Sequence, residues 1–231
     1  MTRSTFGTPK RALLLLALTL TPLARSARAE SSANNWITPE QLDGSLKERI
    51  DDYRRRTKRS SFAKKIVVSK DSRRMDVYAD DEILKSYVVN LGTDPVSPKQ
   101  VRGDGATPEG YLFVCSKNRQ SQFHRFLGLA YPTPPDVARG VKERLASASE
   151  LEATKRAYRS KSGCPPQGTR LGGAVGIHGS GGFRIGGERV VVVDWTLGCV
   201  AVRDRDIDEL FDHYADIGTL VIINAKESSA P

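Results

Sequence analysis

Hydrophobic and polar positions divide the chain into an N-terminal part with helical spacing and a longer part that alternates every two residues. Leu42, Leu46, Ile50 and Tyr53 recur at intervals of three or four and share one face of a helix. Residues 38–41, Thr-Pro-Glu-Gln, supply a helix start signal just before them. We therefore predict a helix that begins there and flanks the main domain.

From Lys65 onward the period changes to two and β-branched residues dominate, which is typical of strands. The predicted strands lie within residues 66–68, 75–78, 83–89, 111–115, 174–178, 190–195 and 220–223. The second and third form a hairpin that turns at Asp80 and Asp81. Short strands joined by Gly-rich turns predict a mainly β fold with flanking helices, arranged as a β-sandwich or barrel.

Residues 132–168 interrupt the strand pattern and predict a helical insertion. Residues 136–159 have a helix-forming composition, and residues 162–168 form a loop rich in Gly and Pro. The hypothesis is that this insertion lies over a cleft. A further helix is predicted to begin with Asp204 as its N-cap and to carry three acidic residues in its first turn, Asp206, Asp208 and Glu209.

The first 29 residues have the order of a secretory signal peptide. Arg3, Lys10 and Arg11 precede an apolar run at residues 12–20, and Ala-Arg-Ala at residues 27–29 fits a cleavage site. The apolar run is shorter than the roughly 20 residues that a membrane-spanning helix needs. The predicted division of the chain is a signal peptide at 1–29, an N-terminal helical extension at 30–64, the main domain at 65–226 with 132–168 inserted, and a tail at 227–231.

Composition then narrows the class of protein. The chain has 231 residues, of which 39% are hydrophobic and 27% charged, and these values exclude a disordered, collagen-like or multi-span membrane protein. The formal net charge is +9, but residues 1–29 hold five of the 36 basic residues and no acidic one. The remainder has 31 basic and 27 acidic residues, or +4, so a nucleic-acid-binding function loses most of its support. The basic run at residues 54–59 is either a solvated helix end or a surface attracted to an anionic envelope polymer.

Export gives meaning to the three cysteines, Cys115, Cys164 and Cys199. In an oxidising compartment two of them can pair, and we favour Cys115 with Cys164. Cys199 is then unpaired, and it is either a buried, inert residue or a reactive thiol.

Two short segments contain the residue types of an acyl-transfer site. His178 is followed by Gly179, and Cys199 is preceded by Gly198, each pair at the end of an apolar run. Cys199 comes shortly before the predicted helix at Asp204, whose positive dipole end would favour a thiolate. A histidine beside the thiol can take its proton and later return it, and backbone N–H groups around Gly198 can hold an oxyanion. Taken singly, such a cysteine is usually a core residue and such a histidine a structural one.

These segments resemble the L,D-transpeptidase catalytic domain family (YkuD type), whose motif is a His, a spacer and then Ser/Thr-x-Gly-Cys. Here 17 residues separate His178 from Thr196, and Thr196-Leu197-Gly198-Cys199 supplies the second part. A second stretch is similar to the family's Gly-Asp-x-x-Thr-Pro-x-Gly loop, at Gly103, Asp104, Thr107, Pro108 and Gly110. The resemblance runs from about residue 65 to residue 224.

One position departs from the common family pattern. Many members have Arg two residues after the Cys, where this chain has Ala201. Ala201 is closer to the pattern of a subgroup that resembles YafK, as are Trp195, the run Ala-Tyr-Pro at residues 130–132, and Asp136. That likeness implies a peptidoglycan-directed protein and leaves transfer and hydrolysis as alternative reactions.

The resemblance implies a fold, a reaction and a set of site residues. The fold is a L,D-transpeptidase-like β-sandwich or barrel. Cys199 would attack a peptidoglycan peptide stem at the L-centre of diaminopimelate, D-alanine would leave, and an amine of another stem, a lipoprotein lysine or water would resolve the acyl-enzyme. The implied residues are Cys199 as nucleophile, His178 as base and then acid, Gly179 orienting His178 through its carbonyl, Gly198 and Thr196 at the oxyanion and substrate side, and Tyr131 and His124 facing substrate.

The same resemblance implies a location and a set of partners. The protein would act in the periplasm or cell envelope, in cell wall biogenesis and cell shape. It would need no metal and no organic cofactor, would bind no nucleic acid, and would have no stable membrane span after signal cleavage.

Three other classes compete with this assignment. A sortase-like transpeptidase also has His before Cys, but with the His much farther upstream, and papain-like or NlpC/P60 peptidases have the reverse order. A non-catalytic envelope-binding module would keep the fold without needing both His178 and Cys199. In the simplest alternative Cys199 belongs to a structural disulfide.

Overall fold

The computed structural model describes residues 1, 44–179 and 194–226. The predicted signal peptide, the helix start at residues 38–41, the strand residues 190–193 and the tail at 227–231 lie outside the described residues. The chain divides into two units, residues 1–34 and 35–231. All described helices and strands belong to the second unit.

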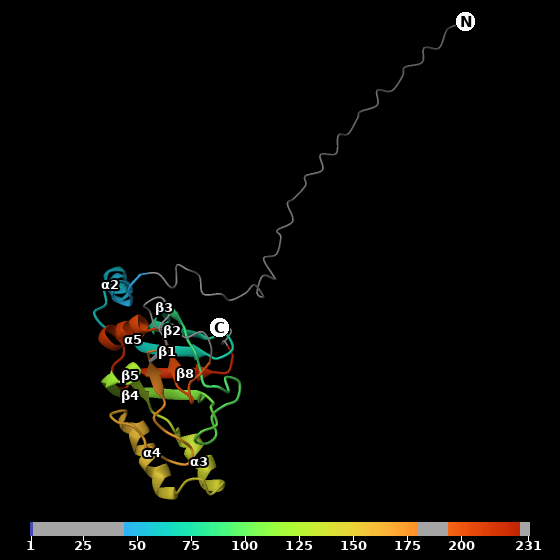
Figure 1. Cartoon of the computed structure of the whole chain (residues 1–231). Coiled ribbons are helices and arrows are strands. Elements are labelled where there is room, and N and C mark those ends of the chain that lie inside the picture. Colours follow the sequence, from blue (N-terminus) through green and yellow to red (C-terminus); the bar gives the residue numbers. More distant parts are fainter. Residues whose placement is uncertain (2–43, 180–193, 227–231) are drawn as a thin grey trace. The chain divides into compact units, whose positions relative to one another are not determined.

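The described strands form one curled, eight-stranded sheet in the order β3-β2-β1-β8-β4-β5-β6-β7 (Figure 1). Their bounds are β1 Lys64–Ser69, β2 Arg74–Ala79, β3 Glu82–Val88, β4 Gly110–Ser121, β5 His124–Leu129, β6 Gly176–His178, β7 Val200–Ala201 and β8 Leu220–Asn224. β1 with β8 and β6 with β7 are parallel pairs, and the other neighbours are antiparallel. The predicted mainly β class with flanking helices is confirmed.

Most of the alternating segments are strands, including the hairpin of β2 and β3 with Asp80 and Asp81 at its turn. The prediction is wrong at residues 174–175, because Ala174 has a left-handed φ and β6 begins only at Gly176, and at residues 194–195, which are not in a strand. β4 extends six residues beyond the predicted end at Cys115, because it pairs with β8 and then with β5. β5 and β7 were not predicted. The two residues of β7 are too few to show a period, so tertiary pairing alone makes them a strand.

The buried side chains form a main core and a small second cluster of Phe113, Cys115 and Ala130 with Tyr158 packed against it. Tyr214 ties the main core to the backbone: its hydroxyl accepts from the N–H of Lys65 at 2.8 Å and lies 2.6 Å from the carbonyl oxygen of Tyr78. Lys65 and Tyr78 are paired across β1 and β2, so a single buried hydroxyl joins two strands to the last helix. Burial of this hydroxyl raises the pKa of Tyr214, which keeps it protonated.

Helix α2, Leu46–Thr57, is the described part of the predicted N-terminal helix. Its first residue follows Ser45, whose side chain accepts from the Glu48 N–H while Glu48 reaches back to the Ser45 N–H. The described helix therefore begins at this capping box. Leu46, Ile50 and Tyr53 are buried as the spacing predicted.

The basic run after α2 is largely paired with acidic neighbours. Arg56 bonds Glu82, and Arg59 bonds Asp80 at 2.5 Å. These contacts neutralise much of the local positive charge, which favours the solvated helix end over a surface attracted to an anionic polymer.

The insertion contains two helices, α3 Pro134–Lys142 and α4 Ala148–Ser160, which pack side by side (Figure 1). The sequence predicted one continuous helical stretch. It divides because Ser147 and Glu150 form a capping box that starts a second helix. The predicted disulfide between Cys115 and Cys164 is present and ties the end of the insertion to β4. In the chain-entropy model a closed loop of this length contributes about 4 kcal/mol.

The last helix begins differently from the prediction. α5 spans Asp204–Glu209, and its N-cap is Arg203, so Asp204 is the first helical residue instead of the cap. The Asp206 carboxylate accepts from the guanidinium of Arg203, which fixes the entry to the helix. A π-helical turn, η1 Leu210–Tyr214, continues α5. Among the described helices, none has the length and apolar character needed to cross a bilayer.

Two buried lysines, Lys70 and Lys99, hold the long loop at residues 92–110. Lys70, 1% exposed, extends from the end of β1 into this loop and donates to Ser97 O at 2.8 Å and to Glu109 Oε1 at 2.7 Å. It also lies 3.3 Å from the carbonyl oxygens of Val96 and Thr107. A loop without regular secondary structure is thereby fixed to the sheet.

We predict that Lys70→Met lowers the free energy of unfolding by about 3 kcal/mol, because the change leaves Glu109 and the loop carbonyls without their buried donor. Urea denaturation of wild type and variant measures the effect. Lys47→Met is the matched control, since Lys47 forms an exposed ion pair with Asp51, and it should leave the unfolding free energy nearly unchanged. Equal losses in the two variants would contradict the structural role of Lys70.

Candidate active site

The two predicted segments meet through the parallel pairing of β6 and β7. Ile177 pairs with Val200, and His178 pairs with Ala201. Side chains alternate along a strand, so Cys199, two residues before Ala201, lies on the same face as His178. The opposite face carries Ile177 and Val200, both fully buried in the core.

The His178 ring is held at its edge and on its faces. Nδ1 lies 2.6 Å from the carbonyl oxygen of Gly179. A carbonyl only accepts, so Nδ1 carries the proton and Nε2 keeps its lone pair. The ring stacks on Phe123 with centroids 4.6 Å apart, lies parallel to Phe126 at 6.1 Å, and meets Trp195 edge-on at 5.8 Å.

This enclosure controls the charge of His178. The side chain is 1% exposed, and burial lowers its pKa below the ordinary value of 6.5, while the hydrogen bond to Gly179 opposes this effect. The imidazole is therefore neutral at pH 7 and able to accept a proton at Nε2.

Cys199 is a free, partly exposed thiol, which excludes a structural disulfide at this position. Its Sγ donates to the carbonyl oxygen of Ala174 at 3.6 Å. Burial raises its pKa to about 11, although the Gly176 N–H and the charge of Lys99 lower it. The expected dipole-stabilised thiolate is therefore wrong: α5 begins at Asp204, and a dipole acts only within about one turn.

Thr196 organises the turn before Cys199. Its hydroxyl donates to Cys199 O at 2.7 Å and accepts from the Gly198 N–H at 3.1 Å. The Gly198 N–H is thus engaged within the turn. Gly198 has φ +127°, and a Cβ there would lie 2.5 Å from the carbonyl oxygen of Ala106, so only glycine fits.

The loop at residues 92–110 packs against this turn and brings a cation close to it. Lys99 is buried, forms an ion pair with Asp104 at 2.7 Å, and has its Nζ 3.6 Å from where a Gly198 Cβ would be. Asp104 also accepts from three backbone N–H groups, those of Gln100, Val101 and Ala106. Thr107 accepts from the Gly92 N–H at 2.9 Å.

A family model described as YkuD, L,D-transpeptidase catalytic domain, matches residues 63–223, which include both segments and this loop. The chain belongs to the L,D-transpeptidase catalytic domain family.

Among solved structures, the chain resembles the helical cell shape determining protein Pgp2 from Campylobacter jejuni, with 19% identity over 73% of this chain and 50% of that one and a TM-score of 0.49. It also resembles Bd1075 from Bdellovibrio bacteriovorus, with 20% identity, coverage of 71% and 49%, and a TM-score of 0.44. The L,D-transpeptidase of Xylanimonas cellulosilytica has 17% identity, coverage of 72% and 62%, and a TM-score of 0.38. The chain spans about half the length of the first two proteins. No functionally curated protein matches it.

The two remaining site candidates of this L,D-transpeptidase domain lie in different environments. Tyr131 is fully buried beneath the insertion, and its hydroxyl donates to Leu171 O at 3.2 Å, so it does not face an open site. His124 has a positive φ of 73°, is partly exposed, and lies 2.7 Å from Asp208 through Nε2. It adjoins the residue after His178, since a Cβ on Gly179 would be 3.1 Å from the His124 Cβ.

Several residues around the L,D-transpeptidase centre were not found from the sequence. Phe123 in the turn before β5 and Phe126 in β5 both flank His178. Lys99 and Ala174 approach the turn at Cys199 from distant segments of the chain. Of these four residues, only Lys99 could have been found from the sequence, because it lies five residues before Asp104 in the loop that resembles the family pattern. Within the described ranges, no three His, Cys, Asp or Glu side chains come together as metal ligands.

We predict that His178 titrates below pH 6.5 and that Phe123→Leu raises its midpoint toward 6.5 by admitting water. NMR titration of the histidine Cε1 protons measures this, with His178→Gln identifying the signal. Phe62→Leu is the control, because Phe62 packs on Tyr53 away from the site. A wild-type midpoint at or above 6.5 would contradict the neutral base.

We also predict that Lys99→Met slows alkylation of Cys199 by iodoacetamide at pH 8 about threefold or more, since loss of the nearby cation raises the thiol pKa further. Lys99→Arg keeps the charge and should retain most of the rate. Lys142→Met changes an exposed lysine of α3 and should have no effect. Unchanged alkylation in Lys99→Met would show that this cation does not act on the thiol.

Proposed function

We propose that this chain is an exported, peptidoglycan-modifying L,D-transpeptidase with Cys199 as nucleophile and His178 as base. The observation that carries the proposal is that the free thiol of Cys199 lies on the same face of the sheet as a neutral histidine. The Nδ1–H of that histidine, His178, donates to Gly179 O. Membership of the L,D-transpeptidase family supports the reaction class and peptide stems as its substrates.

The first half of the reaction forms an acyl-enzyme. His178 Nε2 takes the proton of Cys199, and Sγ attacks the carbonyl at the L-centre of diaminopimelate in a donor stem. The tetrahedral intermediate collapses, the bond to D-alanine breaks, and the imidazolium returns its proton to the leaving amine. A thiol with a pKa of about 11 has little thiolate at neutral pH, so its activation depends on this transfer to His178.

The second half releases the acyl group. An acceptor amine gives a proton to His178 and attacks the thioester, and Cys199 leaves as a thiol. The Gly179 carbonyl orients the imidazole through both halves and stabilises its charged form, as a carboxylate does in other triads. The turn that leads into Cys199 is the proposed oxyanion side, and Thr196 fixes its shape. Because the Gly198 N–H is bonded to the Thr196 hydroxyl, the proposed oxyanion donor is the Cys199 N–H instead.

A YafK-like hydrolase is the second candidate, favoured by the residue beside the histidine. Ala201 is fully buried and pairs with His178, where many relatives have arginine. The site therefore lacks a cation at that position. Water would resolve the same acyl-enzyme, and the cleaved bond would join a stem to a peptide or a lipoprotein lysine.

Action on peptidoglycan implies a location in the cell envelope. The basic start, apolar run and Ala-Arg-Ala of residues 1–29 support export to the periplasm. The Cys115–Cys164 disulfide supports an oxidising compartment. His124, beside Gly179 and bonded to Asp208, is the proposed contact for a substrate at the edge of the site.

We predict that residues 30–231 convert tetrapeptide-bearing muropeptides and that Cys199→Ala lowers the rate by a factor of at least about 10³, because the covalent route is lost. Mass spectrometry of the products measures this. Cross-linked or D-amino-acid-exchanged stems would identify a transpeptidase. Shortened stems, or lipoprotein released from sacculi, would identify the hydrolase.

His178→Gln should show a loss comparable to Cys199→Ala, since the two residues act as a unit. His213→Gln is the matched control, because His213 is an exposed histidine on η1. If the protein forms no product from any of these substrates and Cys199→Ala still binds sacculi, the chain is an envelope-binding module instead of an enzyme.

A further inference from the structure

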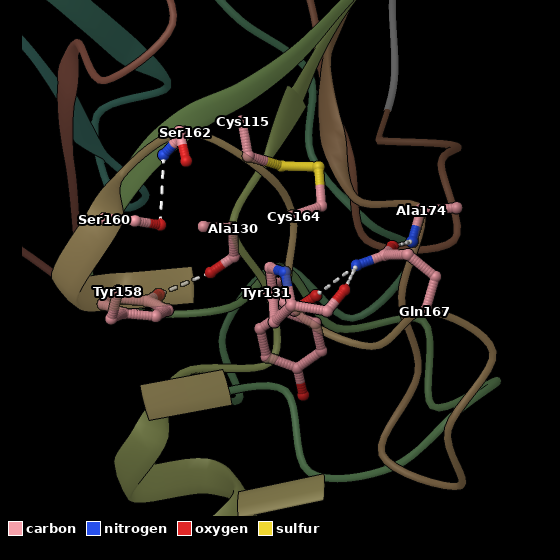
Figure 2. The surroundings of a disulfide bond; sticks show 10 residues. Cys115, Ala130, Tyr131, Tyr158, Ser160, Ser162, Cys164, Gln167 and Ala174 are labelled. Atoms are coloured by element: carbon pink, nitrogen blue, oxygen red, sulfur yellow. Dashed lines mark hydrogen bonds between the residues drawn. A yellow bond between two sulfur atoms is a disulfide. The ribbon is translucent and has the colours of Figure 1, made fainter. Parts of the chain in front are cut away.

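Figure 2 shows the Cys115–Cys164 disulfide together with Gln167 and Ala174, and the carbonyl oxygen of Ala174 accepts from the Cys199 thiol. Cys164, bonded to Cys115 of β4, begins the last part of the insertion, and Gln167 follows three residues later. Gln167 bonds Ala174, and Ala174 accepts from Cys199. None of these partners other than Cys199 belongs to the family motif.

Gln167 is fixed at both ends of its side-chain amide. Nε2 donates to Pro165 O at 2.8 Å and to Tyr131 O at 3.1 Å, which ties it to its own loop and to the backbone after β5. Oε1 accepts from the Ala174 N–H at 2.6 Å. A Cβ on Gly173 would lie 2.9 Å from Oε1, so the amide packs directly on this stretch of backbone.

The residue that Gln167 holds has an unusual backbone conformation. Ala174 has φ +52°, a left-handed value that a residue with a Cβ rarely adopts without support. With its N–H bonded to Gln167, the Ala174 carbonyl oxygen accepts from Cys199 Sγ. Gln167 and the Cys199 thiol thus bond the two peptide units on either side of the same left-handed residue.

The disulfide limits the movement of the loop that carries Gln167. Cys164 is attached to β4, and β4 pairs with β5, which leads to Tyr131. Both carbonyls that orient the Gln167 amide therefore belong to segments fixed to this pair of strands or to the disulfide.

We propose that Gln167 is a positioning residue that aims the Cys199 thiol through the Ala174 carbonyl, and that the Cys115–Cys164 disulfide holds Gln167 in place. Its catalytic meaning rests on the proposed function, but the aiming of the thiol does not. The charged group that acts on the thiol is Lys99 from the 92–110 loop, and His178 of β6 lies on the same face of the sheet; substitution of Gln167 alters neither residue.

The experiment measures two properties of residues 30–231: the alkylation of Cys199 as a function of pH, and the turnover of muropeptides. In Gln167→Met the Ala174 carbonyl loses its support, the thiol loses its acceptor, and its neutral form is less favoured. We expect the pH midpoint of iodoacetamide labelling to fall by about half to one unit, so that labelling at pH 8 rises about threefold to tenfold. Turnover should fall about tenfold or more, because Sγ is no longer aimed.

Three further variants separate aiming from simple loosening. Gln167→Leu removes both donations and the acceptor for the Ala174 N–H without adding charge, and should shift the labelling midpoint as Gln167→Met does. Cys115→Ala/Cys164→Ala removes the covalent tie and should shift the midpoint in the same direction as Gln167→Met, but less. Tyr158→Phe changes a residue of α4 in the same insertion. It removes the hydrogen bond from Tyr158 to Ala130 O and should leave the midpoint unchanged.

An unchanged midpoint in Gln167→Met, or an equal shift in Tyr158→Phe, would overturn the positioning role. An unchanged midpoint in the double alanine variant would overturn the part played by the disulfide. If the midpoint shifts as expected while wild type turns over no muropeptide, the aiming of the thiol stands and the proposed reaction fails.

Discussion

The parallel pairing of β6 with β7 is the contact on which the site depends. Only His178 and Ala201, with Ile177 and Val200, form this ladder, yet it sets the face on which Cys199 and His178 both lie. So short a pairing is not stable by itself. It is held because its inner face is buried in the core and its outer neighbours, β5 and the backbone at Asn90, bond it from both sides.

Burial shapes the chemistry of this pair. Aromatic rings exclude water from His178, and Cys199 is partly buried, so each group is favoured in its neutral form. The resting site therefore holds a thiol and an imidazole instead of an ion pair. Lys99 offsets part of the cost of the thiolate, and Gly179 O offsets part of the cost of the imidazolium, so charge is stabilised mainly when the proton moves.

Two segments without strand structure hold the thiol turn from opposite sides. The 92–110 loop is fixed by buried lysines, because each ammonium bonds carbonyl and carboxylate oxygens of the loop. The end of the insertion is fixed by the Cys115–Cys164 disulfide and by the amide of Gln167. The end of the insertion therefore reaches the backbone that contacts the nucleophile, whereas a cover over a cleft stays a prediction.

Residues near one another in the chain were enough to predict the strands with clear alternation, the Asp80–Asp81 hairpin, the family, and the two segments around His178 and Cys199, because periodicity and spaced motifs are local features. The pKa of the Cys199 thiol, the aromatic cover of His178, and the approach of Lys99 and Gln167 follow from the folded chain alone. Each of these depends on burial and on contacts between segments distant in the chain. The dipole prediction failed for the same reason: sequence gives the distance to a helix along the chain, whereas desolvation of the thiol is set by everything packed around it.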